Sequence, residues 1–349
     1  MKNNNEQLLN SVSLLIKEAR NLVVRNVNTT MVYTYFHIGR MIVEEEQHGK
    51  DRAAYSESVL KELSGHLTKE YGKGFSHRNL EYFRKFYLSY TNRISQSVIA
   101  KFQTDNQQVI NTQSLNAFSE KFKLSWTHYI QLIKIGNDEE RDFYEIESAS
   151  NNWSVRELQR QFNSSLYERL ALSKDKQELK HLSSKGQVIE KPFDTLKTPY
   201  VLEFLNLEES SSYTENDLET AIIDKLEHFM MELGKGFLFE GRQKRITLDG
   251  DHFYVDLVFY NRLLRCFVLI DLKIGKLAHQ DIGQMQMYVN YYDRKVKLPD
   301  EKNTIGIVLC KQENKAVVEF TLPLGNDQIF AKEYKLYLPS KEDLKRQLE

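Results

Sequence analysis

The sequence has little cysteine and no long apolar run. It contains 2 cysteines, Cys266 and Cys310, and neither lies in a CxxC motif or at metal-binding spacing from a histidine. Both fall in apolar segments, which is typical of reduced core residues. No stretch approaches the ~18 apolar residues of a membrane span, and no signal-like segment opens the chain. We therefore expect a soluble, cytoplasmic protein with no membrane partner.

The chain also lacks a strong net charge, which is −1 over its 349 residues. Lys and Arg are in slight excess in residues 1–200, whereas Asp and Glu are in excess in residues 201–349. Hydrophobic residues at 41% and aromatic residues at 11% suffice for packed cores and exclude wholesale disorder. The length favours two domains, and the uneven charge fits a nucleic-acid-binding module joined to an acid-rich site. An ordinary solvated surface would show the same small bias.

The first 190 residues are predicted to be all-helical. Apolar residues recur at helical spacing in residues 6–27, 31–46 and 55–72. Gly72 and Gly74 then predict a turn, followed by a helix that Ser76 would cap. The predicted apolar face of that helix consists of Leu80, Phe83, Tyr87 and Leu88.

Basic residues lie on the other faces of this helix, at Arg78, Arg84 and Lys85. A turn followed by a basic, aromatic-rich helix is what a helix-turn-helix protein needs to approach DNA phosphates and bases. A later helix, which starts with Ser154 and Glu157 in capping-box spacing, is expected to expose Arg156, Arg160 and Arg169 in the same way. Ordinary amphipathic helices with solvated cations would give the same pattern, so both interpretations stay open.

Two segments of low periodicity divide the chain. Residues 93–120 are rich in Gln, Asn and Ser and are predicted to be a loop or an insertion. Residues 173–199 are charged and contain Pro192 and Pro199, which is typical of a linker. We therefore predict a helical, DNA-binding domain over residues 1–190 and a second domain over 191–349.

The second domain is predicted to have the order α-β-β-β-α-β. A helix capped by Asn216 carries an apolar stripe, and strands follow at 237–248, 251–260 and 263–273. Tight turns are expected at residues 249–251 and 261–262. A helix at 278–294 and a strand at 304–310 complete this order, and a final strand is expected at 328–338. The apolar stripe consists of Leu218, Ala221, Ile222, Leu226, Phe229 and Leu233.

Three charged residues stand inside the apolar segments predicted as strands, namely Asp256, Asp271 and Lys273. A charge in a core strand is costly unless it is paired or bound to a metal. Side chains alternate along a strand, so Asp271 and Lys273 share a face, and the tight turn makes the strand of Asp256 their antiparallel neighbour. The two carboxylates could hold Mg²⁺ while the lysine activates water or stabilises charge on a phosphate. A structural ion pair between Lys273 and Asp271 is the alternative, but it would leave Asp256 unpaired.

This pattern resembles the PD-(D/E)XK nuclease superfamily, whose members have the restriction-endonuclease-like α/β fold with a mixed central sheet. The similarity is closer to the YhcG-type members, also described as DUF1016 proteins, which join a helical N-terminal domain to a C-terminal nuclease domain. Val255 replaces the proline of the motif, and the acid before Lys273 is Asp. The resembling segments are GFSHRNLEYFRKFY, LSWTHYIQLI, WSVRELQRQFNSSLYERLALS, PYVLEFL, GFLFEGRQKRI, FYVDLVFYNRLLRCFVLIDLK and IGQMQMYVNYYD.

The resemblance implies a set of site residues. Asp256 and Asp271 would be metal ligands, the backbone carbonyl of Leu272 would complete the shell, and Lys273 would act on the attacking water. Glu219 would be the further acid found in many members. It would lie at position N3 of a helix capped by Asn216, so a capping role is the alternative.

Further residues are implied around this set. Gln284 and Tyr288 are four residues apart and resemble a QxxxY element that positions the substrate or the lysine. A helix surface with a half-buried tyrosine is the alternative. Arg242 and Gln243, followed by Lys244 and Arg245, are candidates for phosphate contacts, although edge-strand charges are often simply solvated.

The sequence thus predicts an enzyme, a Mg²⁺-dependent DNA endonuclease in which Mn²⁺ can substitute. DNA is favoured over RNA because no RNA-recognition sheet signature or GXXG clamp is present. A catalytically inactive DNA-binding or scaffolding protein and an RNA nuclease are the alternatives. A homodimer and partner proteins from defence systems or mobile elements would suit the resemblance.

Overall fold

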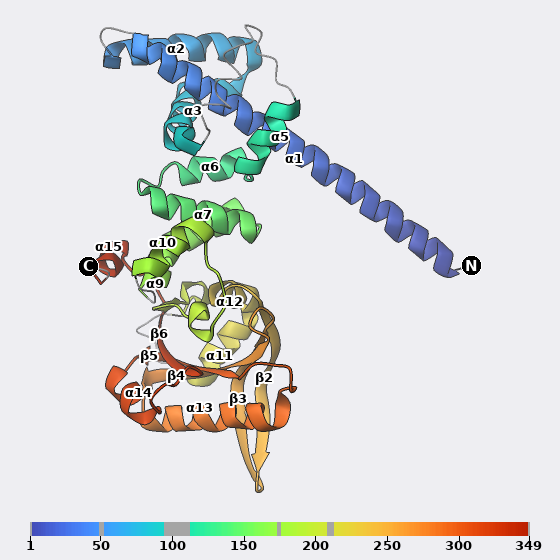
Figure 1. The fold of residues 1–349 in the computed structure, drawn as a ribbon, viewed down its shortest axis with the longest axis vertical. Helices are drawn as coiled ribbons and strands as arrows, with labels where there is room; N and C mark the ends of the chain where they lie inside the picture. The colour runs from blue at the N-terminus through green and yellow to red at the C-terminus, as the bar shows by residue number, and fades with distance from the viewer. Residues whose placement is uncertain (1, 49–51, 94–111, 173–175, 208–212, 348–349) are drawn as a thin grey trace. The chain divides into compact units, whose positions relative to one another are not determined.

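The computed structural model describes residues 2–48, 52–93, 112–172, 176–207 and 213–347 (Figure 1). It divides into two compact units, Met1–Gln159 and Arg160–Glu349. Among the described helices, none is both long and apolar enough to cross a membrane.

The first unit is helical, as the sequence predicts, and its core is aromatic. Phe36 of α1 (Lys2–His48) contacts the rings of Phe86, Phe118 and Phe122, at centroid distances of 5.7 to 6.0 Å. Gly39 lets α1 approach the next layer closely, because a Cβ there would lie 2.1 Å from the carbonyl oxygen of Phe83. The other helices among the described residues of this unit are α2 (Arg52–Tyr71), α3 (His77–Tyr90), α5 (Thr112–Lys121), α6 (Trp126–Leu132), α7 (Asp138–Ser150) and α8 (Val155–Asn163).

The structure confirms two helix starts in this unit and corrects one apolar face. Ser76 accepts a hydrogen bond from the amide of Asn79, and Ser154 and Glu157 form the predicted capping box. The buried face of α3 consists of Leu80, Phe83, Phe86 and Tyr90. Leu88, predicted to lie on that face, is exposed, because helical spacing from Leu80 and Phe83 leads to Phe86 and Tyr90 instead.

Two segments predicted to lack regular structure contain helices. Thr112–Lys121 forms α5, which buries Phe118 against α1, whereas residues 94–111 of the predicted insertion lie outside the described residues. Lys176–Lys185 forms α10 within the predicted linker, where Leu182 is buried. A few apolar side chains therefore suffice to order segments whose overall composition is polar.

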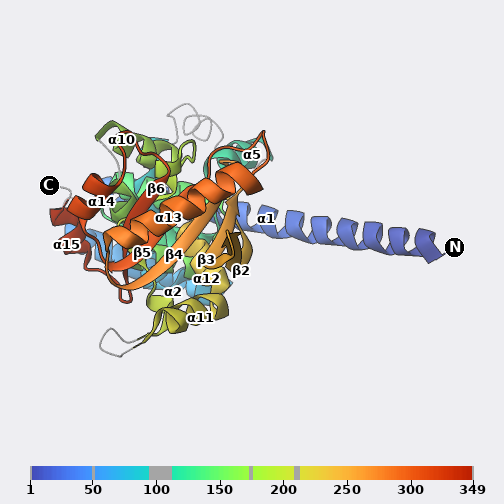
Figure 2. The same ribbon diagram turned by 90° about the horizontal axis from the view of Figure 1, so that it is seen from below.

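The second unit is built on a six-stranded mixed sheet in the order β1-β6-β5-β4-β3-β2 (Figures 1 and 2). The pairs β2–β3 and β3–β4 are antiparallel, whereas β4, β5, β6 and β1 run parallel. Asp249 and Gly250 have φ angles of 48° and 93°, which suit the predicted hairpin turn between β2 and β3. The strands are β1 (Tyr200–Val201), β2 (Phe237–Leu248), β3 (Asp251–Asn261), β4 (Cys266–Lys276), β5 (Ile305–Gln312) and β6 (Ile329–Lys335).

Helices cover both faces of the sheet, so the central strands are apolar on each side. α11 (Glu215–Asp224) and α12 (Leu226–Leu233) bury the predicted stripe against one face, and α13 (His279–Tyr291) lies across the other (Figure 2). The stripe was predicted on one helix, but the chain breaks at Lys225 to form two. The remaining helices are α9 (Leu166–Ala171), α14 (Lys315–Thr321) and α15 (Lys341–Arg346), with a π-helical turn at Tyr292–Val296.

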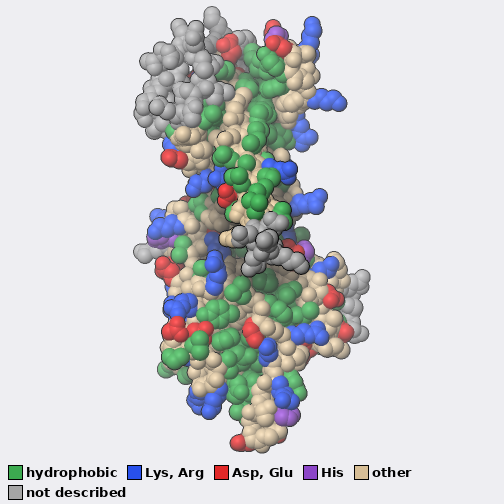
Figure 3. Space-filling view, turned by 90° about the vertical axis from the view of Figure 1, so that its right-hand side faces the viewer, with side chains coloured by type: hydrophobic (Ala, Val, Ile, Leu, Met, Phe, Trp, Pro, Cys, Tyr) green, Lys and Arg blue, Asp and Glu red, His purple; other side chains and the backbone are tan. Residues whose placement is uncertain are grey.

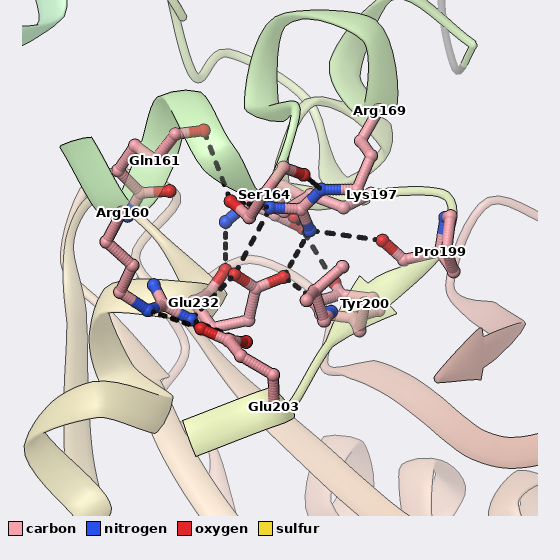
Figure 4. A network of polar contacts seen from close by, with 11 residues as sticks. Arg160, Gln161, Ser164, Arg169, Lys197, Pro199, Tyr200, Glu203 and Glu232 are labelled. Atoms are coloured by element: carbon pink, nitrogen blue, oxygen red, sulfur yellow. Dashed lines mark hydrogen bonds and ion pairs between the residues drawn. The ribbon is translucent and has the colours of Figure 1, made fainter. Parts of the chain in front are cut away.

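A buried ionic network contacts β1, the first strand of the sheet (Figure 4). Arg169 on α9, predicted to project from its helix, is instead fully buried, because its guanidinium group pairs with the equally buried Glu232 on α12. Glu232 also accepts a hydrogen bond of 2.9 Å from the amide of Val201, which fixes the start of β1. Burial alone would raise the pKa of Glu232, but the charges of Arg169 and Lys197 hold that pKa below its usual value.

We expect Glu232→Gln to destabilise the protein by about 3–5 kcal/mol, because it leaves the buried Arg169 guanidinium without a counter-charge. The matched control is Asp300→Asn, which removes one partner of the exposed Arg265–Asp300 pair and should cost less than ~1 kcal/mol. Urea unfolding of the full chain measures both values. Equal losses in the two variants would contradict a stabilising role for the network.

Candidate active site

The three charged residues of the central strands meet where β3 and β4 separate. The backbone ladder of these strands ends at the pair Leu257 and Ile270, one step before Asp256 and Asp271. There the carboxylate of Asp256 replaces the backbone as acceptor, since its Oδ2 takes the amide N–H of Leu272 at 2.8 Å. The side chain of Asp256 is thus fixed by the strand that carries Asp271.

Lys273 is paired with Asp271, as the strand period predicts. Its Nζ lies 2.9 Å from Asp271 Oδ2 and 3.6 Å from Glu215 Oε2 at the start of α11. Burial alone would lower the pKa of Lys273, but the Asp271 carboxylate raises it, so the ammonium group stays charged. The alternative, an ion pair between Lys273 and Asp271, therefore describes part of the contacts. It does not account for Asp256, whose carboxylate accepts hydrogen bonds from uncharged donors.

Asp271 is the most perturbed carboxyl of the set. Its side chain is almost fully buried, and burial together with the nearby charge of Asp256 raises its pKa to about 7 despite the contact with Lys273. A buried carboxylate beside a second carboxylate is unfavourable unless a cation is close to both. The site therefore stores electrostatic repulsion that a bound cation would relieve.

Gln243 connects a third acid to this group. Its side-chain amide donates to Glu219 and also to Asp256 Oδ1, the latter at 3.1 Å. Gln243 has a φ of 48°, an uncommon value for a residue other than glycine inside a strand. The pKa of Glu219 is raised by burial and by the charge of Asp256, although the hydrogen bond from Gln243 acts in the opposite direction.

The structure shows that Glu219 does not cap its helix. Thr214 is the N-cap of α11, and Asp217 occupies the N3 position in a capping box with it. The prediction that Asn216 is the cap was wrong by two residues, because Thr214 and Asn216 are both good cap residues and each has an acid three positions later, Asp217 and Glu219. Glu219 lies beyond the cap, with its side chain directed to Gln243.

The QxxxY pair lies on one face of α13, as predicted. The amide of Gln284 donates to the hydroxyl of Tyr288, which in turn donates to the backbone carbonyl of Tyr254 at 2.9 Å. Tyr288 is buried, and this burial, together with the charges of Asp271 and Asp256, raises the pKa of its phenol. This chain of hydrogen bonds fixes β3 two residues before Asp256.

The oxygen donors present fit a hard cation with an incomplete protein shell. Within the described residues, no three His, Cys, Asp or Glu side chains are already arranged to hold a metal ion. Two carboxylates from adjacent strands, Asp256 and Asp271, are available together with the backbone carbonyl of Leu272. Mg²⁺ characteristically takes one or two carboxylates and completes its shell with water and substrate phosphates, so this donor set suits it.

The structure changes the interpretation of two basic residues near the second unit's core. Arg160 is turned inward, where it pairs with Glu203 at 3.0 Å (Figure 4). Its guanidinium group also lies over the ring of Phe204. The guanidinium group is thus engaged by the protein itself, and the contact of Arg160 with nucleic acid stays a prediction. Arg242 on β2 is half-exposed and lies 4.0 Å from Glu219.

The basic residues of the first unit differ in their surroundings. Arg78, Lys85 and Arg156 are exposed, with Arg78 hydrogen-bonded to Tyr82. Arg84 is bound to Glu46 of α1 at 2.7 Å, which fixes α3 against α1. Exposed cations on two helices thus remain as candidates for contacts with a polyanion.

Sequence reasoning missed two features of the site. Glu215, 3.6 Å from Lys273 Nζ, looks in the sequence like an ordinary acid in a first helical turn. Gln243 was predicted to contact phosphate, whereas in the structure it joins Glu219 to Asp256. The pairing of β2 with β3 indicates this role of Gln243. Arg242 pairs with Leu257 and Lys244 pairs with Val255, so Gln243 lies directly opposite Asp256.

The fold and this arrangement of charges agree with two family models that match the chain. The YhcG PDDEXK nuclease domain matches residues 193–349, and the DUF1016 N-terminal domain matches residues 11–169. A curated protein of Escherichia coli (strain K12), named "Putative nuclease YhcG", is 38% identical over 351 residues, which cover 98% of this chain and 93% of that protein. The chain therefore belongs to the YhcG family of PDDEXK nucleases, with a restriction-endonuclease-like second unit.

Two solved structures show more distant similarity. A repair endonuclease from Pyrococcus abyssi aligns with a TM-score of 0.25 and 19% identity over 37% of this chain and 50% of its own. The structure of an EndoMS–dsDNA2 complex aligns with a TM-score of 0.26 and 15% identity over 39% and 51%. The chain thus spans about half of each of these proteins, and similarity at this level supports no conclusion about activity.

The raised pKa of Asp271 predicts a pH-dependent stability in the absence of divalent ions. The unfolded carboxyl has a pKa of ~3.9, so the unfolded state loses its proton first and stability falls as the pH rises toward the folded pKa. Between pH 5.5 and 8 in EDTA, the wild type should lose on the order of 2 kcal/mol relative to Asp271→Asn. Urea unfolding at both pH values measures this difference, and parallel curves for the two proteins would contradict it.

Proposed function

We propose that the chain is a Mg²⁺-dependent DNA endonuclease, with catalysis centred on Asp256, Asp271 and Lys273. The observation that carries the proposal is the meeting of these residues where β3 and β4 separate, with Lys273 Nζ 2.9 Å from Asp271 and Asp256 fixed to the amide of Leu272. The raised pKa of Asp271 supports it, since perturbed carboxyls concentrate at functional sites.

Asp256, Asp271 and the backbone carbonyl of Leu272 would hold the cation, and Mn²⁺ would serve in the same site. When bound, such a cation lowers the pKa of a coordinated water and neutralises charge on a phosphate oxygen. Asp256 is preorganised for this role because Gln243 and the Leu272 amide fix its orientation. Glu219, held by the same Gln243, adds negative charge beside the ligands.

Lys273 supplies a positive charge next to the reacting phosphate. Its ammonium group is held in place by Asp271 and Glu215, so it can orient the attacking water and stabilise the developing negative charge. Gln284 and Tyr288 are positioning residues in this scheme, because they fix the β3 backbone at Tyr254 through the Tyr288 hydroxyl.

DNA binding by the helical domain is the second part of the proposal. We place this domain at residues 1–190 and the nuclease domain at 191–349. Arg78, Lys85 and Arg156 are exposed and can reach phosphates, with a smaller contribution from Arg84, which is shared with Glu46. Arg242 is the corresponding candidate beside the active site.

Cleavage of a DNA panel tests the catalytic part. We expect the wild type to cut duplex, single-stranded or branched DNA with Mg²⁺ or Mn²⁺ but not with EDTA. Asp271→Ala and Lys273→Ala should each reduce the rate by at least ~100-fold, because each removes a group that acts at the phosphate. Lys276→Ala, an exposed lysine on the same strand, is the matched control and should retain the wild-type rate.

Two outcomes of this panel would favour other functions. A wild type that binds DNA but cuts no substrate with either metal would identify a scaffolding protein without turnover. Cleavage of RNA alone, lost in Asp271→Ala, would leave the catalytic residues in place and refute the choice of DNA.

A salt titration tests the role of the helical domain. The double variant Arg78→Ala with Lys85→Ala should weaken binding to a labelled duplex in EDTA and reduce the slope of log K against log salt by about 2, one for each lost phosphate contact. The control, Lys17→Ala with Arg20→Ala, removes the same charge from exposed positions of α1. An unchanged slope in the first variant, or an equal change in both, would refute DNA binding by α3.

A further inference from the structure

The first half of α1 exposes an unusual amount of apolar surface. Within the described residues, it projects away from the other helices of its own unit (Figure 1), and green side chains gather along it in Figure 3. Polar residues are expected all round a helix that stands alone in water. The large hydrophobic side chains exposed there are Leu8, Leu9, Val12, Leu14, Leu15, Ile16, Leu22, Val23, Val24 and Val27.

Most of these side chains follow a seven-residue repeat. Leu8, Leu15 and Leu22 occupy one position of the repeat, d, and Val12, Ala19 and Asn26 occupy a second position, a. Leu9, Ile16 and Val23 widen the stripe by filling position e. Alternating steps of three and four residues form a continuous seam along one side of an α-helix, which is the pattern of a coiled coil.

The same seam is buried in the second half of the helix. Extending positions a and d leads through the half-buried Thr29 to Tyr33, Phe36, Arg40 and Val43, and these last four are buried. Phe36 there packs on rings from α3 and α5. One face of α1 thus keeps a single phase from Leu8 to Val43, but the described helices of its unit cover only the later part.

We propose that the first half of α1 pairs with the same segment of a second copy of this chain, as a parallel two-stranded coiled coil. Leucine fills all three d positions, and Val12 at position a is β-branched, a combination that favours two parallel strands. Asn26 stands at position a, where a buried asparagine pairs with itself only in a parallel, in-register dimer, and so sets both register and strand number.

The exposed area is sufficient for a stable pair. The seven large hydrophobic side chains at positions a, d and e each expose on the order of 100 Å². Two copies would therefore bury roughly 1,400 Å², which lies in the range of a standard protein–protein interface. The assembly would carry two copies of the site around Asp256 and Asp271. The pairing itself does not depend on the proposed cleavage of DNA, so either can fail without the other.

Light scattering during size-exclusion chromatography tests the seam. The wild type should be a dimer at micromolar concentration, and Leu15→Glu with Leu22→Glu should be a monomer. The control, Leu14→Glu with Val24→Glu, changes residues of equal exposure outside the seam and should remain a dimer: Leu14 and Val24 are 58% and 59% exposed, Leu15 and Leu22 66% and 58%. Circular dichroism verifies that both variants are folded.

A monomeric or trimeric wild type would overturn the proposal, and so would a seam variant that dimerises as well as the control. Orientation is tested by Leu8→Cys, Leu15→Cys and Leu22→Cys, made separately, since both natural cysteines are buried. A parallel, in-register pair allows all three to form an intermolecular disulfide on oxidation. An antiparallel pair allows at most one, and Leu14→Cys should form none in either case.

Discussion

The repulsion between Asp256 and Asp271 is the constraint on which the candidate site of the second unit depends. Asp271 is buried among apolar residues of a central strand, and its pKa is raised to about 7 by that burial and by the neighbouring carboxylate. The surrounding contacts hold both groups in place in spite of this cost. Lys273, Gln243 and the Leu272 amide each supply a donor, and the Tyr288 hydroxyl fixes the strand that carries Asp256.

A strained site of this kind needs a rigid frame, and the two helical layers provide it. α11 and α12 cover one face of the sheet and α13 covers the other, so the strands that carry the acids are packed on both sides. The buried Arg169–Glu232 pair fixes the start of the sheet from behind. The packing of these layers stabilises the folded state and so offsets the unfavourable free energy of the buried charges at the site.

Much of this arrangement could be predicted from the sequence, because it depends on short-range periodicity. The strand period placed Lys273 beside Asp271, and the turn at Asp249 and Gly250 set the antiparallel hairpin. The sequence does not distinguish Thr214 from Asn216 as the cap of α11, since both residue types cap helices and each has an acid three positions later. The inward orientation of the Arg160 side chain could not be predicted from the sequence, because its partners Glu203 and Glu232 are distant in the chain.

The central claim is that Asp256 and Asp271 form one cation site before any substrate is present. Calorimetric titration of the full chain with Mn²⁺, in the absence of nucleic acid, tests it most directly. We expect the wild type to bind Mn²⁺ and Asp256→Asn to lose that binding, since two carboxylates and one carbonyl are the donors that the protein offers. Equal binding by both proteins, or none by the wild type, would contradict it.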